Sequence, residues 1–99
     1  MIFSPCVYIL TNQKNTVLYI GVTSNINKRI SEHKAHKYPN SFSAKYKTSK
    51  LVYFEKFQKM TDAIAREKQL KAGSRLKKEI LINLINPEWK DLAADIVVE

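Results

Sequence analysis

The stretch CVYILTNQKNTVLYIGVTSNINKRISEH, residues 6–33, decides the fold of this chain. It contains two short runs rich in β-branched and aromatic residues, 7–10 and 17–22, which are separated by the polar segment 11–16. Two such runs on either side of a turn-forming segment are typical of a β-hairpin. The sequence therefore predicts two antiparallel strands near the start of the chain.

The pairing of this hairpin follows from where its loop closes. We expect Leu10 to pair with Val17. Because antiparallel partners keep a constant sum of residue numbers, Tyr8 is then predicted to lie directly opposite Tyr19. Alternation along the strands puts both phenols on the same face as Gly21, where the missing side chain leaves room for another group to approach. The hairpin thus predicts a site built around two phenols.

A helix is predicted to follow the second strand. The segment Thr-Ser-Asn at 23–25 offers N-cap oxygens, and Ile26 and Ile30 have the spacing of one helical face. Cationic side chains follow the edge of this face, one turn apart or nearly so. Such a row is suited to binding phosphate. The row consists of Arg29, His33 and His36.

The composition fits one small domain with a polyanionic partner. Ninety-nine residues, 44% of them hydrophobic, suffice for a single core, so we expect one domain over 1–99. The 17 Lys and Arg residues against 9 Asp and Glu give a net charge of +8, which favours nucleic acid as the partner. An anionic membrane surface is a weaker alternative, because the basic residues are spread from Lys14 to Lys90.

The cysteine content and the start of the chain indicate the compartment. The single cysteine, Cys6, cannot form an internal disulfide, and no spacing of Cys and His matches a zinc motif. Segment 1–13 is uncharged, contains Pro5 and is too short to cross a bilayer, so no targeting signal is expected. These features predict a reducing, cytoplasmic setting, in which the Cys6 thiol is a small buried hydrophobe.

After the first helix, a loop and a third strand are predicted. Segment 34–49 is polar and basic, contains a Pro-Asn turn signal, and is expected to be a long loop. Aromatic residues in such a loop stack on bases or pin the loop to the core, and we favour pinning. Segment 51–57, LVYFEKF, is the expected third strand. The aromatic loop residues are Tyr38, Phe42 and Tyr46.

Two helices are predicted to complete the chain. The first begins at Thr61-Asp62 and runs to about Ala72, with Gly73 as its stop and Ser74 as the cap of the second. The second ends before Asn86-Pro87, because the residue preceding a proline is disfavoured in helical geometry. The expected core-facing stripe of the second helix is Leu76, Ile80, Leu81 and Leu84, and the closing segment packs back through Trp89, Leu92 and Ile96.

Glu67 is the most informative residue of this half. Helical periodicity places it on the same inward arc as Ala63 and Leu70 rather than on the solvent side. A buried carboxylate is costly unless it is paired, hydrogen-bonded or bound to a metal. From spacing alone, an ion pair with Arg29 or Lys71 ranks ahead of metal binding.

Five stretches, taken in order, resemble segments of the GIY-YIG nuclease superfamily. The resemblance covers nearly the whole chain and is closest to small single-domain bacterial proteins named as endonucleases, which are similar to the catalytic domain of the excinuclease C subunit. It implies an α+β fold in which a small three-stranded antiparallel sheet is flanked by about three helices. The stretches are VYIL, YIGVTSNINKRISEHK, KLVYFE, AIAREKQLK and NPEWKDL.

Several residues match the functional positions of that superfamily. The first motif reads Cys6-Val7-Tyr8, so cysteine and valine stand where the family name has glycine and isoleucine, and the tyrosine is kept. By position, the resemblance implies site roles for Tyr8, Tyr19, Gly21, Arg29, His33 and Glu67, with Asn86 as a looser match to a late asparagine.

The resemblance implies hydrolysis of a phosphodiester with one divalent cation, Mg²⁺ or Mn²⁺, held by Glu67. A hard cation of this kind needs few protein carboxylates, because it keeps most of its waters and takes substrate oxygens. Arg29 would clamp the phosphate. We expect Tyr19 to be the base and Tyr8 its hydrogen-bonding partner, with nearby cations lowering the phenol pKa, and His33 is the alternative base.

Two functions from different classes remain open at this stage. The first is a DNA endonuclease acting in repair or recombination on structured DNA, with no small-molecule cofactor and no membrane partner. The alternative is a non-catalytic nucleic-acid-binding module that keeps the nuclease fold. A third, a fold used only for protein contacts, ranks low because it leaves the charge unexplained. The lysines expected to bind DNA are Lys28, Lys45 and Lys47.

Overall fold

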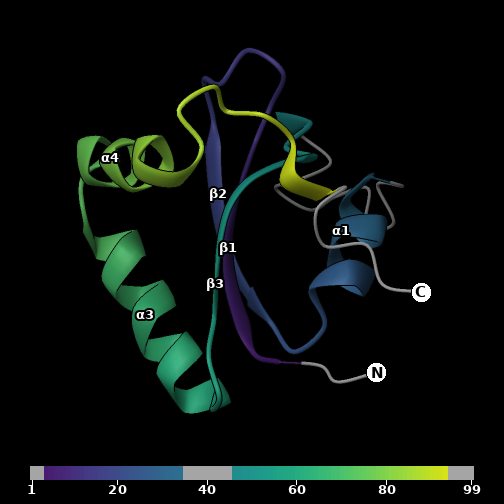
Figure 1. Cartoon of the computed structure of the whole chain (residues 1–99), viewed down its shortest axis with the longest axis vertical. Coiled ribbons are helices and arrows are strands. Elements are labelled where there is room, and N and C mark those ends of the chain that lie inside the picture. The colour runs from purple at the N-terminus through teal and green to yellow at the C-terminus, as the bar shows by residue number, and fades with distance from the viewer. Residues whose placement is uncertain (1–3, 35–45, 94–99) are drawn as a thin grey trace.

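The computed structural model describes residues 4–34 and 46–93, apart from the side chains of residues 33 and 34. It has the α+β fold expected from the sequence, with one three-stranded antiparallel sheet between helices (Figure 1). Strand β1 (Cys6–Thr11) is central, with β2 (Leu18–Thr23) and β3 (Lys50–Lys56) at the two edges. The expectations for His36, Tyr38, Phe42, Lys45 and Ile96 fall outside the described residues.

The hairpin forms as predicted, but its register differs by two residues. Tyr8 pairs with Gly21, and Leu10 pairs with Tyr19, so the prediction that the two tyrosines lie directly opposite each other is wrong. The side chain of Asn12 causes the difference, because its Oδ1 accepts hydrogen bonds from the backbone amides of Thr16 (2.8 Å) and Val17 (3.2 Å). These bonds hold Val17 in the loop, and the strands begin to pair one residue later.

Strand β3 contains an irregularity that explains its weak alternation. Ile9 of β1 pairs with Tyr53, and the next residue, Leu10, pairs with Leu51, which leaves Val52 without a partner across the ladder. The extra residue is a β-bulge and turns Val52 and Tyr53 to the same side of the sheet, where both join one core cluster.

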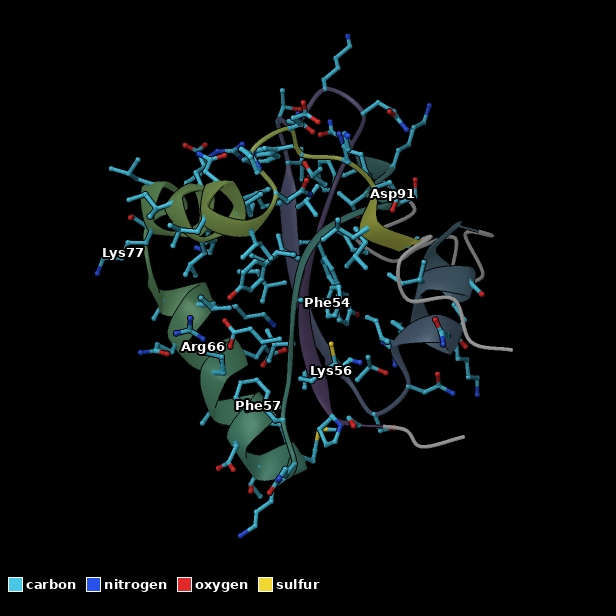
Figure 2. All side chains as sticks on the ribbon, viewed as in Figure 1. Phe54, Lys56, Phe57, Arg66, Lys77 and Asp91 are labelled. Atoms are coloured by element: carbon cyan, nitrogen blue, oxygen red, sulfur yellow. The ribbon has the colours of Figure 1, made fainter. Side chains whose placement is uncertain are left out.

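The helices cover both faces of the sheet (Figure 1). Helix α1 (Ile26–Lys34) lies on one face, and α3 (Met60–Ala72) and α4 (Arg75–Ile85) lie on the other. Figure 2 shows both sides: Phe54 of β3 packs with the buried residues on the α1 face, and Phe57, which follows β3, packs with those on the α3 face. Each face therefore has its own core, and the sheet separates them.

The α1 core is small and includes a tyrosine. Its buried members are Tyr8, Leu10, Ile30 and Leu51. The α3 and α4 core is larger, and its buried members are Val7, Ile9, Ile20, Val52, Tyr53, Ala63, Leu70 and Ile82.

The predicted helix ends are confirmed at most positions. Asn25 caps α1, since its Oδ1 accepts from the Lys28 amide at 3.1 Å, and Ser74 caps α4 by accepting from Lys77 at 3.2 Å. Helix α4 ends at Ile85, before Asn86-Pro87. The predicted start of α3 at Thr61-Asp62 is wrong by about two residues, because Lys59 is its N-cap and makes no side-chain cap bond.

The predicted core-facing stripe of α4 is wrong. Leu76, Ile80 and Leu84 are 65%, 51% and 74% exposed, and Ile82 is the wholly buried residue of the helix. Ile82 is 200° around the helix axis from both Ile80 and Leu84 at 100° per residue. Helix α4, which follows the short connection at Gly73-Ser74, therefore packs on the sheet through its Ile82 side. Leu81 is partly buried at the border of that side.

The segment after α4 packs back on the sheet as expected, through Trp89 and Leu92. It also covers the outer edge of β3: Asn86 Nδ2 donates to the Val52 carbonyl at 3.1 Å, and the Leu51 amide donates to Asp91 Oδ1 at 3.1 Å. Tyr46 is exposed rather than pinned to the core as predicted. None of the helices in the described part of the chain has the length and apolar character needed to cross a bilayer.

Candidate active site

The first half of the candidate site lies on the α1 face, where Tyr8 packs over Gly21. Tyr8 is wholly buried, and its ring centroid is 6.2 Å from that of Tyr19, with the ring planes inclined by 39°. A Cβ atom added to Gly21 would come under 3.0 Å from the hydroxyl and ring of Tyr8. The space above Gly21, predicted to admit another group, is therefore filled by the Tyr8 phenol.

Arg29 completes this cluster from helix α1. Burial raises the pKa of Tyr8 above its ordinary value, and the neighbouring Tyr19 adds to the rise. The Arg29 guanidinium, which hydrogen-bonds the phenol, opposes both effects but does not outweigh them. Arg29 thus acts on the Tyr8 pKa in the expected direction, but burial outweighs it and the net shift of the pKa is upward. Its hydroxyl stays protonated at neutral pH and can act as a hydrogen-bond donor.

Arg29 also faces solvent. Its Nε is 3.4 Å from Glu32 Oε1, and the two side chains line a polar depression at the start of α1 together with Lys28. Lys28 itself is exposed. The hydrogen bond with Tyr8 therefore fixes one side of the Arg29 guanidinium, and the exposed side is open to an anion.

Tyr19 differs from Tyr8 because it lies on the edge strand β2 and is only partly buried. It lines a shallow groove along that edge, which we call the β2-edge groove. The groove extends from β2 to the end of α3 and the start of α4, and it is lined by Leu18, Tyr19, Ile20, Lys71 and Lys78.

Glu67 supplies the second half of the site from α3, on the opposite face of the sheet. Its side chain is 16% exposed, which confirms the predicted inward position, and its Oε2 is 3.2 Å from Lys71 Nζ. Of the two predicted partners, the structure selects Lys71 and not Arg29. Lys71 lines the β2-edge groove with Tyr19, so the two halves of the site meet at the outer edge of β2.

The donor set of Glu67 fits a hard divalent cation. A carboxylate that is partly exposed offers the oxygen donor that Mg²⁺ or Mn²⁺ prefers, and such a cation completes its shell with water and substrate oxygens. Over residues 4–34 and 46–93, no three His, Cys, Asp or Glu side chains are grouped around a metal position. Glu67 would therefore act as a single protein ligand rather than as part of an all-protein cage.

Two other predicted site residues, Lys47 and Asn86, lie outside the strands and helices that carry this cluster. The backbone of His33 continues α1 one turn beyond Arg29. The amide of Asn86 is occupied by backbone groups: Nδ2 donates to the carbonyls of Val52 (3.1 Å) and Lys90 (2.8 Å), and Oδ1 accepts from the Lys90 amide (3.0 Å). Lys47 is exposed before β3. Cys6 is buried as expected, and burial raises the pKa of its thiol to about 11.

Sequence reasoning missed an ion pair beside Glu67. Arg66 donates from Nε to both carboxylate oxygens of Glu55 at 3.2 Å and from Nη2 at 3.1 Å, and the Tyr53 hydroxyl donates to the same carboxylate. This network joins α3 to β3 one residue before Glu67. No spacing in the sequence signals it, because the strand and the helix are brought together only by the fold.

Comparison with known proteins places the chain in a family. The family described as GIY-YIG catalytic domain matches residues 4–79. The chain therefore belongs to the GIY-YIG family, which is a family of nucleases.

Its relatives are small proteins of about the same length. It is 40% identical over 82 residues to a UPF0213 protein of Syntrophus aciditrophicus, covering 83% of this chain and 92% of that protein. It is 38% identical over 80 residues to a UPF0213 protein of Natronomonas pharaonis, covering 77% and 87%. The NMR structure of a UPF0213 protein from Bacillus halodurans superimposes with a TM-score of 0.57 at 25% identity, over 96% of this chain and 99% of the other.

Proposed function

We propose that this protein is an endonuclease that hydrolyses phosphodiester bonds in DNA with the help of a single divalent cation. The observation that carries the proposal is the position of Tyr19. Its ring packs beside Tyr8, which is hydrogen-bonded to Arg29. Tyr19 also lines the groove that is bordered by Lys71, the ion-pair partner of Glu67. A phosphate at the β2 edge would meet a guanidinium, a phenol and a carboxylate.

Arg29 is the proposed phosphate clamp. Its guanidinium is planar, keeps its charge at any relevant pH, and presents donors that match the oxygens of a phosphate. The hydrogen bond with Tyr8 holds one side of the group in place, so less side-chain entropy is lost when the phosphate binds.

Tyr19 is the proposed general base, and Tyr8 is its hydrogen-bonding partner. Tyr19 is only partly buried and lines the β2-edge groove, whereas Tyr8 is sealed in the α1 core. Because burial raises the pKa of Tyr8, that phenol is a donor rather than a base. His33 is the alternative base, one turn along α1 from Arg29.

Glu67 is the residue that would hold the cation. When bound, Mg²⁺ or Mn²⁺ supplies positive charge that offsets the charge developing on the phosphate and on the leaving oxygen. The net charge of +8 and the exposed Lys28 beside Arg29 support a polyanionic substrate. Recognition through phosphates and shape would suit structured DNA, as handled in repair or recombination.

Cleavage of a labelled panel of single-stranded, duplex, flapped and branched DNA tests this proposal, with Mg²⁺, Mn²⁺ or EDTA. Wild-type protein is expected to give metal-dependent product. Glu67→Gln and Arg29→Ala are expected to lower the rate at least about 10²-fold, because each removes charge stabilisation of the transition state. Tyr19→Phe is expected to lower it to a similar extent.

Glu79→Gln is the matched control. Glu79 forms an ion pair with Arg75 at 2.7 Å on α4, with the same i,i+4 spacing as Glu67 and Lys71, so this variant loses an equivalent surface pair and should keep full activity. Circular dichroism confirms that each variant is folded. Salt-sensitive binding without product on any substrate would instead establish the non-catalytic nucleic-acid-binding module.

A further inference from the structure

We propose that the β2-edge groove is a second phosphate-binding site, in which Lys71 and Lys78 bind a backbone phosphate of the substrate strand next to the phosphate that reacts. This inference rests on the proposed function and deepens it. The residues already expected to bind nucleic acid lie on the α1 side or before β3. The groove lies on the other side of β2, between the strand and the helices α3 and α4.

The charge of the groove is of one sign. Among the described residues that line it, only Lys71 and Lys78 are charged, and Leu18 and Ile20 are apolar. A cation next to an apolar wall is less screened by water than one on an open surface, so its attraction for an anion is stronger. The ligand chemistry that fits is a phosphodiester, which carries one negative charge and accepts hydrogen bonds.

Lys71 is free to change partners. Its side chain is 54% exposed, and its contact with Glu67 is a surface i,i+4 pair at 3.2 Å. An ion pair with one exposed member is screened by water and holds that member weakly. The ammonium group is a compact charge on a flexible stem, so it can turn from Glu67 to a phosphate in the groove at little cost. A cation on Glu67 would favour that turn, because it takes over the neutralisation of the carboxylate.

Lys78 is held in place, in contrast to Lys71. Its Nζ donates to the carbonyls of Gly73 at 2.7 Å and Ser74 at 3.4 Å, where α3 ends and α4 begins. These two carbonyls fix the ammonium group but do not cancel its formal charge, and one N–H donor remains for a ligand. A fixed cation at the mouth of a groove is pre-organised for an anion, whereas a lysine extended into solvent is not.

The arrangement predicts the path of the substrate strand. Lys28 and Arg29 line the depression on the α1 side, and Lys71 and Lys78 line the β2-edge groove together with Tyr19. Successive phosphates of one strand would therefore cross the outer edge of β2, with Tyr19 between them. Lys77, one residue before Lys78, points away from the sheet (Figure 2) and is not part of this path.

The salt dependence of DNA binding tests the proposal without any need for catalysis. Binding of a fluorescein-labelled single-stranded oligonucleotide is measured by anisotropy in EDTA over a range of NaCl concentrations. Each phosphate contact contributes roughly 0.7 to the slope of log K against log salt for single strands. Lys71→Gln and Lys78→Gln are each expected to reduce the slope by about 0.7.

Lys56→Gln is the matched control, because Lys56 is exposed on β3, at the opposite edge of the sheet (Figure 2). The slope of log K against log salt for Lys56→Gln should equal that of the wild-type protein. Lys78→Arg keeps the charge and should retain the wild-type slope. If Lys78→Gln does not fold because the α3–α4 junction is weakened, Lys71→Gln and Lys78→Arg still decide the question.

The outcomes separate this proposal from the function on which it rests. Wild-type protein that cleaves DNA, together with unchanged slopes for Lys71→Gln and Lys78→Gln, would overturn the groove site and leave the nuclease intact. An equal reduction of the salt slope for Lys56→Gln would also overturn the groove site, because the effect would then come from net charge. Wild-type protein that neither binds nor cleaves DNA would remove the proposed function itself.

Discussion

The two faces of the sheet hold their parts of the candidate site in different ways. On the α1 face, Tyr8 is sealed against Gly21 by close packing within the hairpin. On the α3 face, Glu67 and its neighbour Arg66 are held by ion pairs to Lys71 and Glu55. Packing of a buried ring tolerates little displacement, whereas partly exposed ion pairs can exchange partners.

This difference suits the proposed chemistry. The α1 face would present a fixed guanidinium and phenol to the phosphate, and fixed donors require no reorganisation during the reaction. The α3 face would have to accept a cation and release Lys71, which a surface ion pair allows. Three measurements test whether the two faces differ in this way.

Gly21→Ala tests the packing of the α1 face and should have the largest effect. The new Cβ would come under 3.0 Å from the buried Tyr8 ring, so we expect a loss of about 3 kcal/mol in the free energy of unfolding, measured with urea. Gly73→Ala is the control, because its Cβ would be 3.5 Å from the nearest atom and its φ is −79°. Similar stability of the two variants would contradict the packing argument.

Alkaline pH tests the buried acids of β1 and should have the next largest effect. Burial raises the pKa of Cys6 from 9.0 to about 11, so above pH 9 the folded state binds more protons than the unfolded state. The stabilisation of the folded state by this shift is complete below pH 9 and is lost as pH rises through 11. The free energy of unfolding falls over that range by up to about 1.4 kcal/mol per pH unit.

Cys6→Ala is expected to remove this slope between pH 9 and 10 in urea unfolding curves. Tyr8, whose pKa is also raised by burial, continues to lower the stability above pH 10 in both proteins. An identical decline between pH 9 and 10 with and without the thiol would show that Cys6 does not titrate as its burial requires.

The Arg66–Glu55 pair tests the α3 face and should have the smallest effect. Both side chains are 25% exposed and share several hydrogen bonds, so a double-mutant cycle of Arg66→Gln and Glu55→Gln should give a coupling of about 1 kcal/mol. The exposed pair Arg75 and Glu79 is the comparison, with about 0.5 kcal/mol or less. A coupling for Arg66 and Glu55 as large as the Gly21→Ala effect would erase the distinction between the two faces.

Much of the fold could be predicted because its signals are local. The hairpin, the Asn25 and Ser74 caps and the end of α4 before Pro87 depend on residues within a few positions of one another. The inward position of Glu67 followed from helical periodicity alone. The roles of Tyr19, Arg29 and Glu67 in a reaction came from a family resemblance and remain predictions.

The rotation of α4 and the bulge in β3 depend on distant contacts, whereas the start of α3 is a local error. The rotation of α4 could not be predicted, because Leu76, Ile80 and Leu84 are as apolar as the buried Ile82 and only the docked helix distinguishes them. The bulge at Val52 is visible only when β3 is paired with β1. The start of α3 at Lys59 lacks a side-chain cap and therefore lacks a sequence signal.

The sequence by itself determined where strands and helices form, the family to which the chain belongs, and which residue types can do chemistry. These depend on backbone preference, side-chain periodicity and the order of short motifs along the chain. Only the tertiary structure decided that Tyr8 fills the space above Gly21, that α4 packs through Ile82, and that Arg66 pairs with Glu55. The physical reason is that packing and charge pairing act between neighbours in space, and those neighbours exist only once the sheet and its helices have assembled.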